Sequence, residues 1–173
     1  GSNKILKTMN RKYTRQHYLK LIKKIRAVMP EAMVSTDIIV GFPGETKKDF
    51  KKTMSLFKKA HFNMAYINQY SSRPGTASAN MEDDIPKKEK KRRDEKLTAL
   101  LEKISLKENK KNIGERTRIL VENKKGDVYI GKNPQFKTVK ARGKGLKIGL
   151  FAPVAITGAS DWGLEGKFIN RNE

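Results

Sequence analysis

Two loops rich in glycine and proline carry the residues of this sequence whose types and spacing could do chemistry. The first, GFPGE, runs from Gly41 to Glu45 and directly follows an apolar stretch that contains Asp37. Gly41 and Gly44 permit backbone conformations, and a close approach of a ligand, that a Cβ atom would block. The loop lacks the Gly-Lys-Ser/Thr that a phosphate-binding P-loop requires, so we exclude that function.

The two carboxylates near this loop each allow two interpretations. Asp37 lies within an apolar stretch, where an unpaired carboxylate would cost free energy, so we expect it to have a partner. That partner is either a polar group inside an active-site cavity or a neighbouring loop to which Asp37 is hydrogen-bonded. Glu45 either caps the helix that follows it or lines the same ligand pocket.

The second loop, YSSRPGT, runs from Tyr70 to Thr76, and Arg73 is its only cation. The planar guanidinium of arginine suits a carboxylate or a phosphate group. Tyr70 could stack on a base, although an aromatic side chain at the end of a strand more often packs in the core. A ligand with an anionic group is therefore the expected occupant of this loop.

The sequence contains no cysteine and only two histidines, His17 and His61. The absence of cysteine excludes disulfides, thiolate metal sites and cysteine nucleophiles. The histidines are far apart in the sequence and neither has an acidic residue nearby, so we interpret both as ordinary surface or packing residues. We therefore expect no metal site.

The charge of the chain points to a polyanionic partner. It has 39 Lys and Arg against 18 Asp and Glu, a formal net charge of +21. Such an excess favours nucleic acid as the partner, ahead of a membrane surface. No apolar run approaches the roughly 20 residues of a membrane span, so we expect a cytoplasmic protein.

The elements of the first half alternate between helix and strand. A helix begins after Thr14 and ends at Pro30, a strand covers residues 33–40, Thr46 begins a second helix, and a second strand covers residues 64–70. This order predicts parallel strands, whose ligands bind beyond their carboxyl ends, where both loops lie. Two strands alone leave both sheet edges open, so this half resembles part of a larger α/β sheet or barrel.

The hydrophobic period changes from 3.6 to 2 in the second half. A long basic helix is predicted after Pro86, and five short antiparallel strands follow it, which predicts a small all-β barrel of OB-like type. The predicted division is 1–85, 86–112 and 113–173. In the third predicted strand, Lys140 and Arg142 should share one face, with Lys137 and Val139 on the other. We expect phosphate contact there, although lysines can also simply solvate the outside of a barrel.

Four blocks of this sequence resemble one known family. MNRKYT, STDIIVGFPGETKKDF, SSRPGT and the final barrel, in this order and spacing, resemble the C-terminal half of the radical-SAM methylthiotransferases, most closely the MiaB-type tRNA-modifying enzymes. The resemblance covers residues 3–169. It implies the end of a radical-SAM (TIM-like) barrel followed by a TRAM domain. It also implies an enzyme that adds a methylthio group to a modified adenosine beside the tRNA anticodon, with S-adenosylmethionine and two 4Fe-4S clusters as cofactors.

The resemblance also assigns candidate site residues, none of them catalytic. Those implied to bind S-adenosylmethionine belong to the two strands and their loops: Thr36, Asp37, Val40, Gly41, Gly44, Glu45, Tyr70 and Arg73. Those expected to contact tRNA, at its anticodon stem-loop, belong to the barrel: Lys137, Lys140, Arg142 and Lys147.

The main departure from the family is the absence of its cysteines. Members hold their clusters with cysteines, including a Cys-x3-Cys-x2-Cys motif, and iron–sulfur clusters need such thiolates. We therefore expect this chain to be an inactive fragment by itself. Two alternatives stay open: a non-catalytic basic RNA-binding module, and a sister family that modifies an aspartate of a ribosomal protein. The basic barrel favours the RNA substrate.

Overall fold

The computed structural model describes residues 1–170, and the chain forms two compact units. Unit 1 is Gly1–Leu101 and unit 2 is Glu102–Glu173. The boundary falls within one long helix, α4 (Lys87–Lys110), which the predicted division had treated as a segment of its own.

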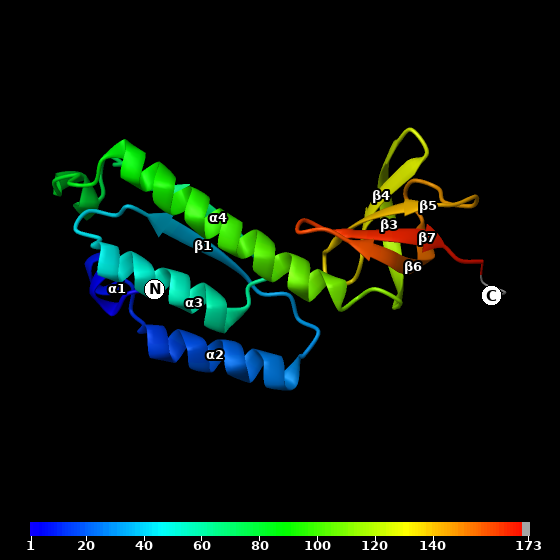
Figure 1. Cartoon of the computed structure of the whole chain (residues 1–173), viewed down its shortest axis with the longest axis horizontal. Coiled ribbons are helices and arrows are strands. Elements are labelled where there is room, and N and C mark those ends of the chain that lie inside the picture. Colours follow the sequence, from blue (N-terminus) through cyan, green and yellow to red (C-terminus); the bar gives the residue numbers. More distant parts are fainter. Residues whose placement is uncertain (171–173) are drawn as a thin grey trace. The chain divides into compact units, whose positions relative to one another are not determined.

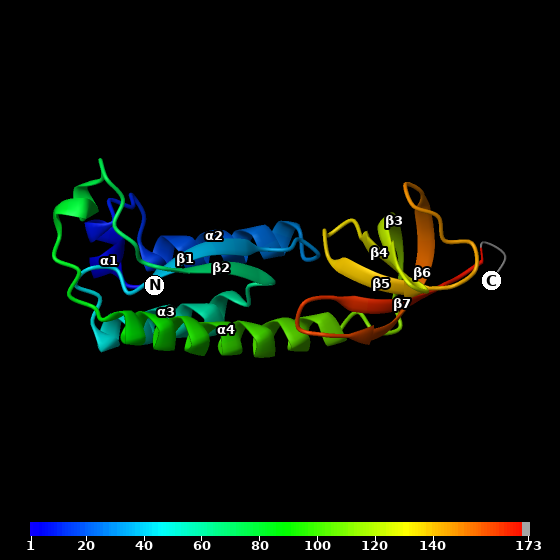
Figure 2. The same cartoon turned by 90° about the horizontal axis from the view of Figure 1, so that it is seen from above.

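Unit 1 contains a pair of parallel strands flanked by helices (Figure 1). The two strands pair in parallel, with Ser35 opposite Met64 and Val40 opposite Gln69, so the predicted parallel pairing is confirmed. Figure 2 places α3 and α4 along the same side of the strands. Besides α4, the elements of this unit are α1 (Asn3–Thr8), α2 (Arg15–Val28), β1 (Ser35–Val40), α3 (Lys47–Ala60), β2 (Met64–Gln69) and the short 3-10 helix η1 (Ala77–Asn80).

Side-chain caps fix where α2 and α3 begin, as the sequence predicts. The Thr14 hydroxyl accepts a hydrogen bond of 3.2 Å from the backbone N–H of His17. At α3, the Thr46 hydroxyl accepts from the Asp49 N–H at 3.2 Å, and the Asp49 carboxylate accepts from the Thr46 N–H at 3.3 Å. This reciprocal capping box satisfies amide groups that have no partner within the helix.

The apolar side chains of α3 form much of the core of unit 1, whereas those of α2 do so only in part. Phe57 is fully buried and its ring lies edge-on to Phe62, with centroids 5.1 Å apart. On α2, Ile22 is buried, but Leu21 is 47% and Val28 80% exposed. The apolar residues of α2 therefore cover a wider face of the helix than the described residues bury.

Unit 2 is a closed five-stranded barrel with strand order β3-β4-β5-β7-β6, and β6 pairs with β3 to complete it. The five predicted strands are confirmed, but the expectation that all pairs are antiparallel is wrong. β5 and β7 run parallel, with Val139 opposite Leu164, because β7 inserts between β5 and β6. The strands are β3 (Arg116–Lys125), β4 (Val128–Lys132), β5 (Thr138–Arg142), β6 (Phe151–Ala159) and β7 (Leu164–Phe168).

The barrel encloses a single apolar core. Because side chains alternate along each strand, the inward positions form one cluster that is buried from solvent. Its members are Ile119, Val121, Val139, Ala141, Leu146, Ala152, Val154, Ile156 and Leu164.

Candidate functional site

A buried ion pair fixes the GFPGE loop. Arg93 of α4 lies 2.6 Å from the Glu45 carboxylate, and the two side chains are only 4% and 3% exposed. The same carboxylate oxygen accepts from the Gly41 N–H at 2.8 Å, and Arg93 also donates to the Glu45 carbonyl oxygen at 2.8 Å. Glu45 therefore does not cap α3, which Thr46 does. Its carboxylate instead ties the start of the loop to α4.

The two glycines of this loop have different surroundings. Both have positive φ, +70° for Gly41 and +74° for Gly44, which favours glycine. A Cβ atom on Gly41 would lie 2.4 Å from the Cγ atom of Lys90, whereas one on Gly44 would meet no atom within 4 Å. Gly41 thus makes room for a buried lysine stem, and Gly44 is the glycine that borders open space.

Lys90 is a buried cation that sequence reasoning missed. Its ammonium group lies 2.6 Å from the Asp83 carboxylate, donates to the Tyr70 carbonyl oxygen at 3.2 Å, and lies 5.1 Å from the centre of the Tyr70 ring. Nothing in the sequence distinguishes Lys90, or Arg93, from the many exposed cations of the same basic helix. Both become identifiable only when α4 is placed against the GFPGE loop.

Tyr70 and Val40 are core residues, and Arg73 is exposed. The Tyr70 hydroxyl donates to the Ser78 carbonyl oxygen at 2.8 Å, and its ring meets Phe42 edge-on at 5.1 Å. Val40 is fully buried. Arg73 lies in the exposed loop after β2, and its backbone carbonyl accepts from the Thr76 hydroxyl at 2.8 Å. Its guanidinium is therefore available at the carboxyl end of the strands.

One face of the two strands is exposed; we call Asp37, Ile39, Tyr66 and Asn68 the open face. Asp37 pairs in register with Tyr66, and Ile39 with Asn68. Tyr66 is 57% exposed, an unusual position for a large apolar side chain in the middle of a strand. Within residues 1–170 Asp37 makes no hydrogen bond or ion pair, so its expected partner is absent. Because its carboxylate is exposed to solvent, the desolvation cost behind that expectation does not arise.

The open face could have been found more fully from the sequence. In MAYINQ, Tyr66 and Asn68 occupy alternate positions of the strand, as Asp37 and Ile39 do in STDIIV. Parallel pairing of the two predicted strands brings these four positions together. The missing information was which of the two faces the helices cover.

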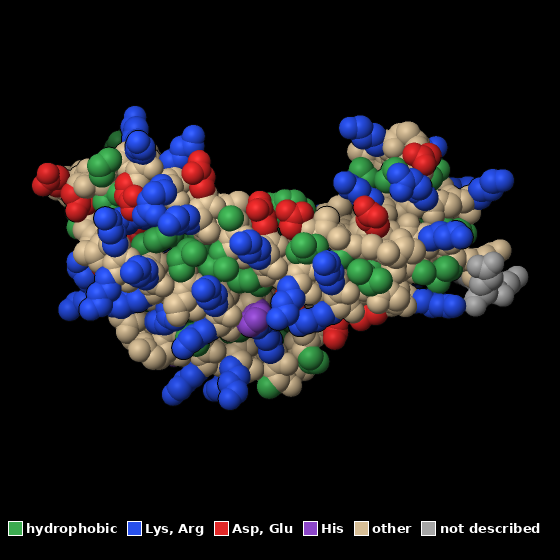
Figure 3. Space-filling view, in the orientation of Figure 1, with side chains coloured by type: hydrophobic (Ala, Val, Ile, Leu, Met, Phe, Trp, Pro, Cys, Tyr) green, Lys and Arg blue, Asp and Glu red, His purple; other side chains and the backbone are tan. Residues whose placement is uncertain are grey.

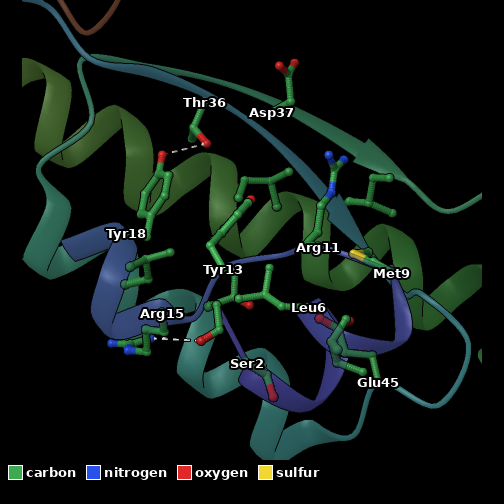
Figure 4. Close-up of a pocket in the computed structure, with 16 residues that line it drawn as sticks. Ser2, Leu6, Met9, Arg11, Tyr13, Arg15, Tyr18, Thr36, Asp37 and Glu45 are labelled. Atoms are coloured by element: carbon green, nitrogen blue, oxygen red, sulfur yellow. Dashed lines mark hydrogen bonds between the residues drawn. The ribbon is translucent and has the colours of Figure 1, made fainter. Parts of the chain in front are cut away.

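A pocket of about 120 Å³ lies where α1, α2 and β1 meet (Figure 4). The Tyr18 hydroxyl donates to the Thr36 hydroxyl at 3.3 Å across it, and the Tyr13 and Tyr18 rings stack at 5.9 Å. Asp37 lies at its rim with the carboxylate pointing outward (Figure 4). Of the residues predicted to bind a cofactor, the pocket brings together Thr36, Asp37 and Glu45; the others, Val40, Gly41, Gly44, Tyr70 and Arg73, do not line it.

Beside this pocket, Asp49 is held in its charged form. Burial alone would raise the pKa of Asp49, but hydrogen bonds from Ser2 and Thr46 outweigh it and lower the pKa to about 2. The Ser2 hydroxyl donates to the carboxylate at 2.6 Å. Asp49 therefore links α1 to the start of α3 and is a structural acid rather than a proton donor.

The pocket is too small to enclose a nucleoside-sized ligand. Sites that enclose drug-sized ligands have roughly 300–1,000 Å³. Next to this pocket, the open face carries an unpaired carboxylate beside exposed apolar side chains. Among residues 1–170 no group of three His, Asp or Glu side chains could hold a metal ion.

The predicted basic residues of the barrel lie at its surface or near it. Lys140 and Arg142 point outward from β5 while Val139 and Ala141 point into the core, which confirms the predicted alternation. Arg142 forms an exposed ion pair with Asp127 at 3.0 Å. Lys147 is exposed in the turn before β6, and Lys137 is half-buried just before β5.

Cations cover much of the molecular surface. In Figure 3, Lys and Arg side chains are spread over the visible face of unit 1 and around the barrel of unit 2. This distribution agrees with the formal charge of +21. Within the part of the chain that the structure describes, no helix has the length and apolar character to cross a membrane.

Comparison with known proteins finds relatives over nearly the whole chain. A model of the radical SAM superfamily matches residues 1–57. Three similar proteins are each named tRNA-2-methylthio-N(6)-dimethylallyladenosine synthase. The protein from Geobacillus kaustophilus is 42% identical over 173 residues, which is 98% of this chain and 33% of the relative. That from Pelotomaculum thermopropionicum is 45% identical over 163 residues, 92% of this chain and 36% of the relative. That from Bacillus subtilis is 40% identical over 172 residues, which is 98% of this chain and 34% of the relative.

These matches cover nearly all of this chain but only part of each relative. The chain spans about one third of the length of the curated relatives it matches. The aligned residues nevertheless include both the α/β unit and the barrel. Over 92–98% of its length, in an alignment that includes both units, the chain is 40–45% identical to proteins named tRNA-2-methylthio-N(6)-dimethylallyladenosine synthase.

Proposed function

We propose that this chain is part of a tRNA methylthiotransferase that adds a methylthio group to a modified adenosine next to the anticodon. The observation that carries the proposal is the similarity, through both units, to proteins named for this activity. In this proposal unit 1 supplies part of the cofactor site and unit 2 holds the tRNA. It implies work in the cytoplasm, where tRNA is modified.

Unit 1 is, in this proposal, the end of a radical-SAM barrel of the TIM type. Within residues 1–170, unit 1 has a parallel strand pair with helices along one side, exposed apolar residues on the other face and no third strand in its sheet. The end of such a barrel would have these features. The open face would then line the barrel interior. Unit 2 is proposed to be a TRAM domain of OB-like form.

The open face and the two loops are proposed to form one side of the S-adenosylmethionine site. When bound, S-adenosylmethionine supplies the methyl group and the radical chemistry. Asp37 offers an unpaired carboxylate to hydroxyl or amino groups, Ile39 offers apolar contact, and Arg73 offers a guanidinium for a carboxylate. Gly44 borders open space in the first loop, and Thr36 lies on the other face of β1 against Tyr18, whereas Val40, Gly41, Glu45 and Tyr70 hold the loops in place.

The iron–sulfur clusters of such an enzyme would need thiolate ligands from outside these 173 residues, because the sequence contains no cysteine. The same absence keeps one alternative open, a basic RNA-binding module without catalysis. It also means that the chain alone has no means to cleave S-adenosylmethionine reductively.

The tRNA contact is proposed to lie on the basic side of the barrel, at Lys137, Lys140, Arg142 and Lys147, against the anticodon stem-loop. A ribosomal-protein substrate is disfavoured because such proteins are themselves basic, and like charges oppose association.

The proposal is tested by measuring the fluorescence anisotropy of a labelled anticodon stem-loop and of a DNA duplex of equal charge, each titrated with this chain across a salt series. Phosphate contact predicts a slope of log affinity against log salt of roughly −0.7 to −0.9 per phosphate neutralised. Tighter binding of the stem-loop, removed by the double change Lys140→Glu and Arg142→Glu, supports the proposal. Equal binding of both ligands with the same slope would contradict it.

A further inference from the structure

A rigid apolar and cationic surface lies on another side of the barrel from Lys140 and Arg142. Arg118 of β3 lies over the ring of Phe151 at the start of β6, with the guanidinium carbon 4.5 Å from the ring centre. Ile148 and Leu150, from the turn before β6, are also more than half exposed. We call Arg118, Ile148, Leu150 and Phe151 the Phe151 platform.

The barrel topology separates this platform from Lys140 and Arg142, whereas Lys147 lies in the same turn as Ile148. Leu120 of β3 pairs in register with Phe151 of β6, so the platform lies over the β3–β6 pair. Lys140 and Arg142 belong to β5, which neighbours neither of these strands. β4 lies between β5 and β3, and β7 lies between β5 and β6. The two surfaces can therefore be changed independently.

The turn that carries the platform is held firmly to β3. The Gly149 N–H donates to the Val121 carbonyl at 2.8 Å, and the Val121 N–H donates to the Leu150 carbonyl at 3.0 Å. Leu146, at the start of the turn, is buried in the barrel core. Phe151 and its neighbours thus lie on a rigid support, which lowers the entropy lost when a ligand binds.

Within residues 1–170 the Arg118 side chain has no carboxylate partner and instead contacts the Phe151 ring. Phe151 itself is 59% exposed. A cation stacked on an exposed ring, without a counter-charge, suits a ligand that is both flat and anionic. Unpaired nucleotides of RNA have this combination, because their bases stack on aromatic rings and guanidinium planes while their phosphates attract cations.

We propose that the Phe151 platform is a stacking site for an unpaired base of RNA, separate from the phosphate contacts on β5. The inference rests on the proposed function, since it assumes an RNA partner. It adds that unit 2 distinguishes looped or single-stranded RNA from a duplex, whose bases are already stacked on one another and unavailable.

The test uses the whole chain with the change Phe151→Ala, a labelled anticodon stem-loop, and a fully paired RNA duplex of equal charge. One stacked base contributes about 1–3 kcal/mol, so stem-loop affinity should fall about 5-fold to 150-fold. The salt slope should stay unchanged because no cation is lost. Duplex affinity should stay the same. An equal loss for both RNAs, or no loss for either, would overturn the proposal.

Matched variants separate base stacking from a general apolar contact. Phe136 is 81% exposed in the same unit and has no cation or ring contact among the described residues, so Phe136→Ala removes a similar ring and should leave affinity unchanged. Phe151→Leu keeps an apolar side chain without a flat ring and should bind stem-loop as weakly as Phe151→Ala. If Phe151→Leu binds like the parent chain, or if sedimentation shows that Phe151→Ala abolishes self-association, the platform contacts protein and the proposal is wrong.

A fluorescence variant gives a direct readout. Trp162 is the only tryptophan, so Trp162→Phe combined with Phe151→Trp leaves a single indole at the platform. Stacking of a base on that indole should quench its emission when the stem-loop is added and not when the duplex is added. Stem-loop binding without quenching would also overturn the proposal. The β5 double change Lys140→Glu and Arg142→Glu reports on the proposed function instead, because it alters the salt slope.

Discussion

The two units differ in how completely their strands are paired and covered. Every strand of the barrel has two neighbours, and the inward side chains form one buried apolar cluster. In unit 1, within residues 1–170, the sheet has two strands, one face is exposed, and a buried ion pair connects the GFPGE loop to α4. Unit 2 is therefore stabilised mainly by apolar burial, whereas unit 1 combines an apolar core with specific polar contacts around its loops.

The largest effect expected in unit 1 comes from breaking its buried ion pair. Arg93→Met leaves the Glu45 carboxylate buried without its counter-charge, which typically costs about 3–5 kcal/mol. Urea unfolding followed by far-UV circular dichroism should show an earlier loss of helix. Trp162 fluorescence, which reports on unit 2, should keep its midpoint. The double change Glu45→Gln and Arg93→Met should recover part of the loss, and equal midpoints for Arg93→Met and the parent chain would show that the pair contributes nothing.

A destabilising substitution in the barrel core should affect only the Trp162 fluorescence transition. Ile119 is fully buried, and replacing it with alanine should lower the free energy of unfolding by about 2–5 kcal/mol. The Trp162 transition should move to lower urea while the helical transition of unit 1 stays in place. If both transitions move together for this variant and for Arg93→Met, the chain unfolds as one cooperative unit and the two units do not differ in this way.

The two loop glycines should show a smaller difference within unit 1. Gly41→Ala adds a methyl group 2.4 Å from the Lys90 stem, so overpacking of about 1–3 kcal/mol should be added to the backbone strain. Gly44→Ala has a similar φ and open space, so it should show the backbone strain alone, about 1–2 kcal/mol. Thermal unfolding of the two variants should therefore rank Gly41→Ala as the less stable, and the reverse ranking would contradict the packing of Lys90 against Gly41.

The smallest expected effect is a loss of stability of unit 1 at low pH. The pKa of Asp49 is about 2 when folded against 3.8 for the free side chain, so its stabilising contribution is complete above about pH 4 and is lost as the pH falls toward 2. Hydrogen bonds from Arg92 and Arg93 similarly lower the pKa of Glu89 to about 2. Both acids belong to unit 1, so its helical signal should lose stability in this pH range. Asp49→Asn should flatten the pH dependence, and an unchanged profile would contradict this assignment.

Local patterns predicted much of this structure, and long-range contacts account for what they missed. The caps at Thr14 and Thr46 and the five barrel strands follow from neighbouring residues and from period. The parallel pairing of β5 with β7 does not follow from local patterns, because it depends on which strand edges β7, the last strand, pairs with. The pairing of Glu45 with Arg93 could not be predicted either, because the two residues are 48 positions apart and Arg93 is one of many cations in a basic helix.

For the candidate site, the sequence located a strand and two loops but could not divide their residues by role. Asp37 and Arg73 are exposed, whereas Val40 and Tyr70 are buried, and this division depends on the face that the helices cover. Residues of one motif therefore serve two purposes, with some shaping the loop and others remaining available to a ligand.

The separation of Glu45 from Arg93 also has a consequence for the order in which the chain is made. β1 and β2 can pair once residue 69 has been synthesised. The GFPGE loop, however, lacks its counter-charge until Arg93 of α4, 48 residues after Glu45, has emerged. The loop should therefore reach its final form after the strand that presents it, since closing the longer connection comes later during synthesis. Ribosome-bound chains that end before Arg93 would carry the parallel strands with a loop that proteases can still cut.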